Sequence, residues 1–279
     1  MKKQLQRGLN QGKGKKPSRL LEVTEGNDVI VGQNKADVVN GGSGNDHISG
    51  KGGNDKLSGD LGDDSLDGDQ KNDLLDGGEG NDQLFGGSGN DALMGGLGSD
   101  TLVGAQGKDI LYGNEDNDLL DGGQGKDLLY GGMGSDALIG GTGNDLLVGA
   151  DALTLQPNLD GTPAAPVAEV DTLTGGGGKD TFVLGLAGNT VLYTAGGDSD
   201  HVVITDFQQP DRIQLAGTAA NYTVKAFASG DGLVNGAGIY LNNGIGSSTG
   251  STTEELVGVL ANVDATTVNL ASSSFTYVV

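Results

Sequence analysis

An aspartate recurs every nine residues over almost half of the chain, with no insertion or deletion between the copies. Each belongs to a short unit such as residues 41–49, in which a glycine lies five residues before the acid and an apolar residue lies two residues after it. A unit of this length cannot bury a core by itself, so successive copies must stack. The periodic residues are Asp28, Asp37, Asp46, Asp55, Asp64, Asp73, Asp82, Asp91, Asp100, Asp109, Asp118, Asp127, Asp136 and Asp145.

The residue types around each aspartate predict a turn followed by a very short strand. The glycines of each unit supply the positive φ angles that a tight turn needs if its carbonyl groups are to converge on one point. The middle residue of the following three is apolar in every copy from Ile30 to Leu147, and again at Leu173 and Phe182. Two units of nine therefore form one coil, in which two thin sheets face each other across a row of interior side chains.

The stacked aspartates require a partner of opposite charge. A coil of two units places Asp46 beside Asp64 and Asp64 beside Asp82, in a chain whose formal net charge is -22. Like charges held this close oppose folding. Calcium, which binds about six to eight oxygen ligands in flexible geometry, fits such a site better than magnesium. The fourteen acids form twelve pairs that are two units apart, which sets an upper limit of twelve stacked sites.

The repeats resemble the RTX calcium-binding nonapeptide family, whose consensus is G-G-x-G-x-D-x-U-x. The similarity runs without a gap over residues 22–149 and resumes at Gly175. It implies an all-β fold, a right-handed parallel β-roll (a β-solenoid with eighteen residues per coil) that holds multiple Ca2+ ions between successive turns. It also implies that Asp171 and Asp180 join the fourteen periodic aspartates as metal ligands.

Several copies depart from the glycines of the consensus. The sites that touch these turns are expected to bind calcium more weakly. The replaced positions are Asp60, Asp69 and Asn114 at the second glycine and Lys35, Lys71 and Asp116 at the third.

Changes in composition along the chain predict five segments. Residues 1–20 form a basic, disordered leader and residues 21–149 form the roll. A proline-containing insertion loop spans 150–170, the last coil spans 171–185, and a β-rich C-terminal cap domain spans 186–279.

The insertion changes the spacing of the acids without changing their phase. The step from Asp145 to Asp171 equals one unit of nine and an insertion of seventeen. If the coil resumes in phase, Asp136 stacks on Asp171 and Asp145 on Asp180.

Residues 186–279 contain longer alternating patterns that indicate strands. A helix is expected from Ser251 to Val263, because Ser251 begins an N-cap sequence, acids follow in the first turn and apolar residues recur at helical spacing. The segment 203–215 resembles the element that follows RTX repeats in serralysin-type proteases and in cyanobacterial calcium-binding proteins. The resemblance implies a cap on the end of the roll and an uncleaved C-terminal signal for the type I secretion apparatus.

One outward face of the coil is unusually apolar. Residues two units apart on this face include Met94, Tyr112, Tyr130 and Val148. We expect the stripe to be covered by the C-terminal domain, by the proline loop or by a partner. Exposure of the two tyrosines would favour a partner.

Composition and motifs exclude several functional classes. An isoelectric point near 4.1 argues against nucleic acid as a partner, since phosphate binding needs a basic surface. The chain has no apolar run long enough to span a bilayer, so we expect it not to be a transmembrane protein. Its two histidines, His47 and His201, are not part of an H-E-x-x-H motif, and it has no cysteine. The sequence therefore predicts no enzyme.

These observations predict a non-catalytic calcium-binding β-roll protein, secreted to the extracellular space or the cell surface of a bacterium. Its expected partners are calcium ions, the type I secretion apparatus and a surface polysaccharide or protein. Two alternatives stay open: an adhesin or matrix protein that binds polysaccharide or protein, and an accessory module of an RTX enzyme.

Overall fold

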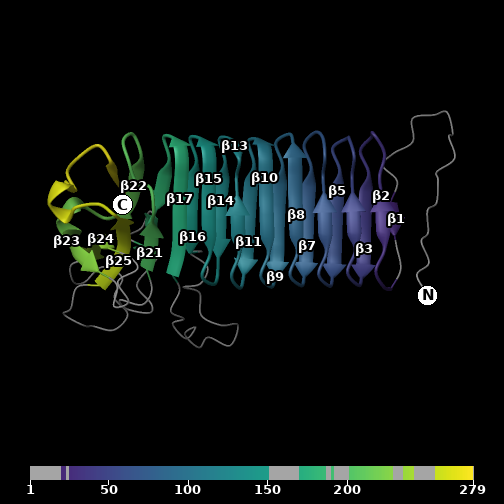
Figure 1. Cartoon of the computed structure of the whole chain (residues 1–279), viewed down its shortest axis with the longest axis horizontal. Coiled ribbons are helices and arrows are strands. Elements are labelled where there is room, and N and C mark those ends of the chain that lie inside the picture. The colour runs from purple at the N-terminus through teal and green to yellow at the C-terminus, as the bar shows by residue number, and fades with distance from the viewer. Residues whose placement is uncertain are drawn as a thin grey trace.

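The computed structural model of the 279-residue chain describes residues 20–22, 25–150, 170–186, 190–191, 201–228, 235–241 and 255–278. In these residues short parallel strands wind into a coil that is drawn out along one axis (Figure 1). Val38 pairs with Lys56 and Lys56 pairs with Leu74, so one coil of the uninterrupted repeats contains two units of nine. The all-β parallel solenoid predicted from the repeat is confirmed.

Two sheets run along the coil. Within the described residues the first has 11 strands. In spatial order they are β1 (Leu20–Glu22), β3 (Val38–Ser43), β5 (Lys56–Leu61), β7 (Leu74–Glu79), β9 (Ala92–Leu97), β11 (Ile110–Glu115), β14 (Leu128–Gly132), β16 (Leu146–Ala150), β18 (Thr181–Val183), β22 (Arg212–Ala216) and β26 (Phe275–Val278).

The second sheet has 13 strands in the part of the chain that the structure describes. They are β2 (Val29–Val31), β4 (His47–Ser49), β6 (Ser65–Asp67), β8 (Gln83–Ser88), β10 (Thr101–Gly107), β12 (Leu119–Asp121), β15 (Ala137–Gly143), β17 (Val170–Gly178), β21 (His201–Ile204), β25 (Glu255–Ala261), β24 (Asn235–Leu241) and β23 (Tyr222–Ala228), with β13 (Gln124–Gly125) between β10 and β15. A short antiparallel pair, β19 (Gly185–Leu186) and β20 (Thr190–Val191), lies outside both sheets.

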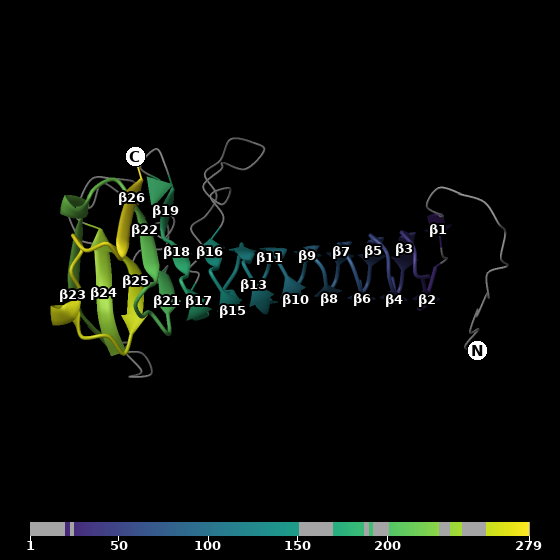
Figure 2. The same cartoon turned by 90° about the horizontal axis from the view of Figure 1, so that it is seen from above.

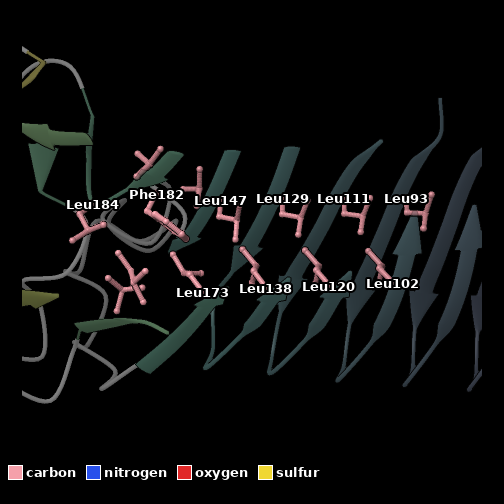
Figure 3. Close-up of a cluster of buried hydrophobic side chains, with 14 of the residues drawn as sticks. Leu93, Leu102, Leu111, Leu120, Leu129, Leu138, Leu147, Leu173, Phe182 and Leu184 are labelled. Carbon is pink, nitrogen blue, oxygen red and sulfur yellow. The ribbon is translucent and has the colours of Figure 1, made fainter. Parts of the chain in front are cut away.

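Each short strand of the coil contributes one side chain to the core between the two sheets. The predicted middle residue of each strand points inward, because its two neighbours point to the opposite face of the sheet. Every interior leucine from Leu57 to Leu147 is fully buried. In Figure 3 the row that contains Leu111 and Leu129 faces the row that contains Leu102 and Leu120.

The repeats resume in phase after the insertion, as the sequence predicts. Strand β17 pairs with β15, and Leu138 lies beside Leu173. The backbone N–H of Asp136 donates to the carboxylate of Asp171 at 2.9 Å, which is the same contact that joins neighbouring coils elsewhere. The predicted loop itself, apart from its ends, lies outside the described residues.

Both sheets continue beyond residue 186, where the sequence suggested a domain boundary. Strands β21 and β25 extend the second sheet in parallel, and β22 and β26 extend the first. Antiparallel strands β23 and β24 then complete the second sheet. This end of the molecule is broader than the roll (Figure 2).

The helix expected from Ser251 to Val263 is wrong. Residues 251–254 lie outside the described residues, and residues 255–261 form strand β25. Residues 256–260 are all buried, so both faces of β25 are covered, and its two edges pair with β21 and β24. A strand buried on both faces has a continuous apolar run, and such a run also contains residues at helical spacing.

Helices are scarce in the described part of the chain. It contains two short 3-10 turns, η3 (Ala219–Asn221) and η4 (Ala265–Thr267). No helix among the described residues has the length and apolarity needed to cross a membrane.

The apolar stripe is buried at Val148 and exposed at Tyr112. Val148 is 7% exposed, whereas Tyr112 is 39% exposed. The Tyr112 and Tyr130 rings stack with centroids 4.9 Å apart and planes inclined by 10°. Exposure of both tyrosines would favour a partner, and this outcome is met at Tyr112 alone, since Tyr130 is partly buried.

Candidate calcium ladders

Each periodic aspartate lies at the end of a turn, immediately before the short strand whose middle side chain points into the core. Its backbone N–H donates to the carboxylate of the aspartate in the next coil. Asp46 N–H donates to Asp64 Oδ1 at 2.6 Å, and Asp64 N–H donates to Asp82 Oδ1 at 2.7 Å. The turns of one edge are thus joined by a continuous ladder of carboxylates.

The structure arranges the sixteen predicted metal ligands in two such ladders, one on each edge of the coil. The first contains Asp28, Asp46, Asp64, Asp82, Asp100, Asp118, Asp136 and Asp171. The second contains Asp37, Asp55, Asp73, Asp91, Asp109, Asp127, Asp145 and Asp180. All except Asp28 are buried.

In thirteen of these carboxylates the second oxygen has no hydrogen-bond donor among the described residues. A buried carboxylate oxygen without a partner carries the full cost of its lost hydration, so it indicates a cation in that space. The oxygens concerned are Oδ2 of Asp28, Asp46, Asp55, Asp64, Asp73, Asp82, Asp91, Asp100, Asp109, Asp118, Asp127, Asp145 and Asp180.

Glycine five residues before the acid makes room for this oxygen. A Cβ atom built on Gly122 would lie 2.9 Å from Asp127 Oδ2 and 2.8 Å from the carbonyl oxygen of Gly140, one coil further on. A Cβ on Gly104 would lie 2.6 Å from Asp109 Oδ2 and 2.9 Å from the carbonyl of Gly122. The space where a side chain would begin is therefore bordered by a carboxylate oxygen and a carbonyl oxygen from neighbouring coils.

This donor set fits a hard cation. Among the described residues, no group of three or more histidine, cysteine, aspartate or glutamate side chains gathers at one point. A cation in a ladder must therefore take much of its coordination from backbone carbonyl groups, together with the carboxylates. Calcium accepts such mixed oxygen ligands, whereas zinc prefers nitrogen and sulfur.

The buried position of the ladders raises the affinity of their carboxylates for protons. The pKa of Asp109 and of Asp118 is raised from 3.8 to about 7, chiefly by burial and to a smaller extent by the carboxylate in the preceding coil. The backbone hydrogen bond that each accepts acts in the opposite direction. Without a cation, the ladder therefore resists full ionisation at neutral pH.

These pKa values predict opposite effects of acid with and without calcium. A carboxyl group whose folded-state pKa lies above its unfolded value favours the fold below that unfolded value, and this contribution is lost as the pH rises through the folded value. In excess chelator, the β-structure content is therefore expected to fall as the pH rises from 5 to 8. In limiting calcium it should rise instead, since protons compete with the ion for the same oxygens. Circular dichroism across this pH range measures both, and a metal-free chain that gains β-structure with rising pH would contradict the assignment.

Five of the six non-glycine residues noted in the sequence keep the left-handed backbone that glycine would adopt. Their φ angles lie between 68° and 85°, and only Lys35 does not share this conformation. The structure adds Lys51 and Ala105, at φ 76° and 74°, which the sequence analysis missed. Both lie four residues before a periodic aspartate, which is the position of the second glycine of the consensus. Comparing this position in every copy with the consensus would have found them.

Ala105 allows a test of this strain. Left-handed backbone costs a residue with a Cβ atom about 1 kcal/mol or more relative to glycine. Ala105→Gly is therefore expected to raise the free energy of unfolding in saturating calcium by about 1 kcal/mol. The matched change Ala92→Gly, on strand β9, should lower it by about 0.5 to 1 kcal/mol. Denaturant titrations measure both, and stabilisation by neither or by both changes would contradict the interpretation.

The structure places a further acid, Asp211, at the end of the second ladder. Its Oδ1 accepts the N–H of Asp180 at 3.1 Å, and its Oδ2 accepts the N–H of Gln208 at 3.0 Å. Because both oxygens have donors, Asp211 extends the ladder without the unpartnered oxygen of the periodic acids. The sequence signal was present, since Asp211 and Ile213 keep the spacing between acid and apolar residue in the repeat.

Asp206 was also missed. Its two carboxylate oxygens accept the N–H groups of Gly175 and Gly176 at 2.9 and 2.7 Å, so it holds the last glycine turn from the following coil. In the first ladder Val202 lies beside Asp171, so the row of acids on that edge ends there.

Comparison with known proteins gives one family. The model of the RTX calcium-binding nonapeptide repeat (4 copies) matches more than half of the chain, over residues 23–57, 58–93, 94–129, 130–151 and 169–191. No curated protein matches the chain.

Among solved structures, 25 chains match. One is the solution structure of the AlgE6R3 subunit from the Azotobacter vinelandii mannuronan C5-epimerase. It is 23% identical, with 64% of this chain and 80% of that chain covered and a TM-score of 0.22. The family match, the coil register and the paired carboxylate ladders together show that this chain belongs to the RTX calcium-binding nonapeptide repeat family and binds several calcium ions.

Proposed function

We propose that this chain is a secreted RTX protein that folds when it binds calcium outside the cell, and that its role is structural or at the cell surface, without catalysis. The supporting observation is the set of thirteen buried Oδ2 atoms that have no hydrogen-bond donor in the described part of the chain. Extracellular calcium modules bind with dissociation constants of about 0.1 to 1 mM. A coil of this kind stays unfolded at the much lower calcium concentration of the cytosol and folds after export.

The periodic acids have a structural role, because their carboxylates hold neighbouring coils together and face the space for the ion. Asp100, for example, holds the backbone N–H of Asp82 with Oδ1 and turns Oδ2 toward the space left by Gly95. A carboxylate committed in this way is not free to transfer protons to a substrate.

Export is tested by locating the protein in a bacterium that carries a type I secretion apparatus. The full chain is expected in the medium, and a passenger protein fused to residues 230–279 should follow it. Without the transporter both should stay inside the cell. Export of the passenger without residues 230–279, or retention of the full chain by a competent transporter, would contradict the proposed route.

A role in adhesion is a second candidate, favoured by one observation. The stacked pair of Tyr112 and Tyr130 leaves an aromatic surface partly exposed on the first sheet. Aromatic faces of this kind bind sugars and apolar protein surfaces. Attachment of the calcium-loaded protein to cells, lost in Tyr112→Ala but kept in Leu119→Ala on the other sheet, would support adhesion over a purely structural role.

A further inference from the structure

A basic pocket lies on the outer face of the first sheet, where the repeats meet the C-terminal segment. Its volume is about 350 Å3, in the range of sites for small molecules. Lys126, Lys179 and Arg212 line it, together with the apolar side chains of Leu128 and Leu146. Three cations in one pocket are unexpected in a chain with a net charge of -22.

The pocket spans four successive coils. Leu128 pairs with Leu146, Leu146 with Thr181, and Thr181 with Arg212, so these residues form one column across β14, β16, β18 and β22. Neighbouring strands lie about 4.8 Å apart, which gives the column a length of about 14 Å. The arrangement suits a ligand a few chemical groups long that lies along the coil axis.

The accessible charge of the pocket is positive. None of the three cations forms an ion pair with a described residue, and the ion pair that the structure shows in its described part joins Lys51 to Asp69. Asp145 also borders the pocket, but it is buried and its Oδ1 accepts the N–H of Asp127. Its Oδ2 belongs to the calcium ladder.

Neutral hydrogen-bonding groups supplement the cations. Asn144 uses its Oδ1 to accept the N–H of Lys179 at 2.9 Å, so its amide nitrogen is the part left to donate to a ligand. The hydroxyl of Thr181 lines the same pocket. Tyr130 lies two residues after Leu128 on the same strand and therefore on the same face of the sheet.

We infer that this pocket binds a short acidic sugar, one to a few residues long, whose anionic group is a carboxylate or a phosphate. Unpaired lysine and arginine bind such groups directly, and arginine does so with two parallel hydrogen bonds. The apolar side chains of Leu128 and Leu146 fit the apolar face of a sugar ring, while Asn144 and Thr181 fit its hydroxyl groups. The acidic surface around the pocket repels a long polyanion, so the ligand is short. This inference requires the calcium-loaded coil but neither secretion nor a surface role.

Isothermal titration of the full-length chain in saturating calcium tests the inference. Trigalacturonate supplies the carboxylate probe, glucose 6-phosphate the phosphate probe and maltotriose the neutral one, all at the same free calcium concentration. One or both acidic probes should bind and maltotriose should not. Backbone amide signals of Leu128, Leu146 and Thr181 should shift with the probe that binds, which also distinguishes carboxylate from phosphate.

Matched variants distinguish binding in this pocket from a non-specific effect of the net charge of the chain. The triple change K126Q, K179Q and R212Q is expected to weaken binding at least tenfold. The triple change K35Q, K56Q and K71Q alters the net charge equally at exposed positions remote from the pocket, and it should change binding less than twofold.

Four outcomes would overturn the inference: no binding of either acidic probe, equal binding of maltotriose, amide shifts elsewhere only, or equal weakening by both triple changes. Circular dichroism in calcium checks the fold of each variant. If the triple variant of the pocket does not fold, Lys126→Gln and Lys179→Gln are measured singly. Each is expected to weaken binding about threefold, and the absence of any weakening would overturn the assignment. If the pocket does not bind an acidic sugar, the proposals of calcium-dependent folding and of export still stand, because circular dichroism and secretion assays test them separately.

Discussion

Chelation of calcium at pH 7.5 is expected to abolish the β-structure of the roll. Thirteen buried carboxylate oxygens have no hydrogen-bond donor among the described residues, and the chain carries a net charge of -22. The interior offers only one side chain per strand to oppose this repulsion. Each site that calcium saturates at about a hundredfold excess over its dissociation constant adds about 2.7 kcal/mol of stability. Folding should therefore appear as a steep transition when calcium is added back.

Far-ultraviolet circular dichroism during a calcium titration measures this transition, and calorimetry gives the number of ions. Magnesium at equal concentration is the control, and it should restore much less structure because it resists losing its water ligands. A chain that keeps full β-structure in chelator, or that folds equally well in magnesium, would refute the calcium assignment.

The second large effect is expected from Gly122→Ala. The added methyl group would lie 2.8 Å from the carbonyl oxygen of Gly140 and 2.9 Å from Asp127 Oδ2. It would occupy the space in which these oxygens face the ion. We expect fewer bound calcium ions per chain and a loss of about 1 to 3 kcal/mol in the free energy of unfolding, since backbone atoms must shift to accept the methyl group.

Gly177→Ala is the matched control. A Cβ atom on Gly177 would meet no atom within 4 Å, and neither glycine has a positive φ angle. The same chemical change should therefore alter stability by less than about 0.5 kcal/mol. Calorimetry and denaturant titration of the two variants decide the matter, because similar losses in both would mean that the space beside Asp127 has no special role.

The fold of the repeats was predictable because one physical requirement recurs in every copy. A strict period of nine fixes which side chains point inward, and it places Asp136 beside Asp171 across an insertion of seventeen residues. The ladder geometry follows from the same period. What the repeat did not reveal is which carboxylate oxygen accepts the neighbouring N–H and which is left for the ion.

The C-terminal segment was harder to predict because its strands are specified by neighbours distant in the sequence. Residues 255–261 form a strand because their backbone pairs with β21 along one edge and with β24 along the other, and β21 lies far before them in the chain. Asp211 joins the second ladder although 31 residues separate it from Asp180. For β25 the local spacing indicated the wrong element, whereas for Asp211 the local spacing of the repeat was present and the distance from Asp180 was not that of the repeat.

The use of two units per coil has a consequence for how such a chain can grow. Gain of one nine-residue copy would leave each strand with a neighbour two units away, yet it would turn everything beyond the insertion by half a revolution. Inserted between Tyr112 and Tyr130, one copy would send the two rings to opposite sides of the molecule. Gain of two copies would lengthen the rod by about 4.8 Å and preserve both surfaces. Changes in repeat number that keep a surface intact must therefore come in even steps.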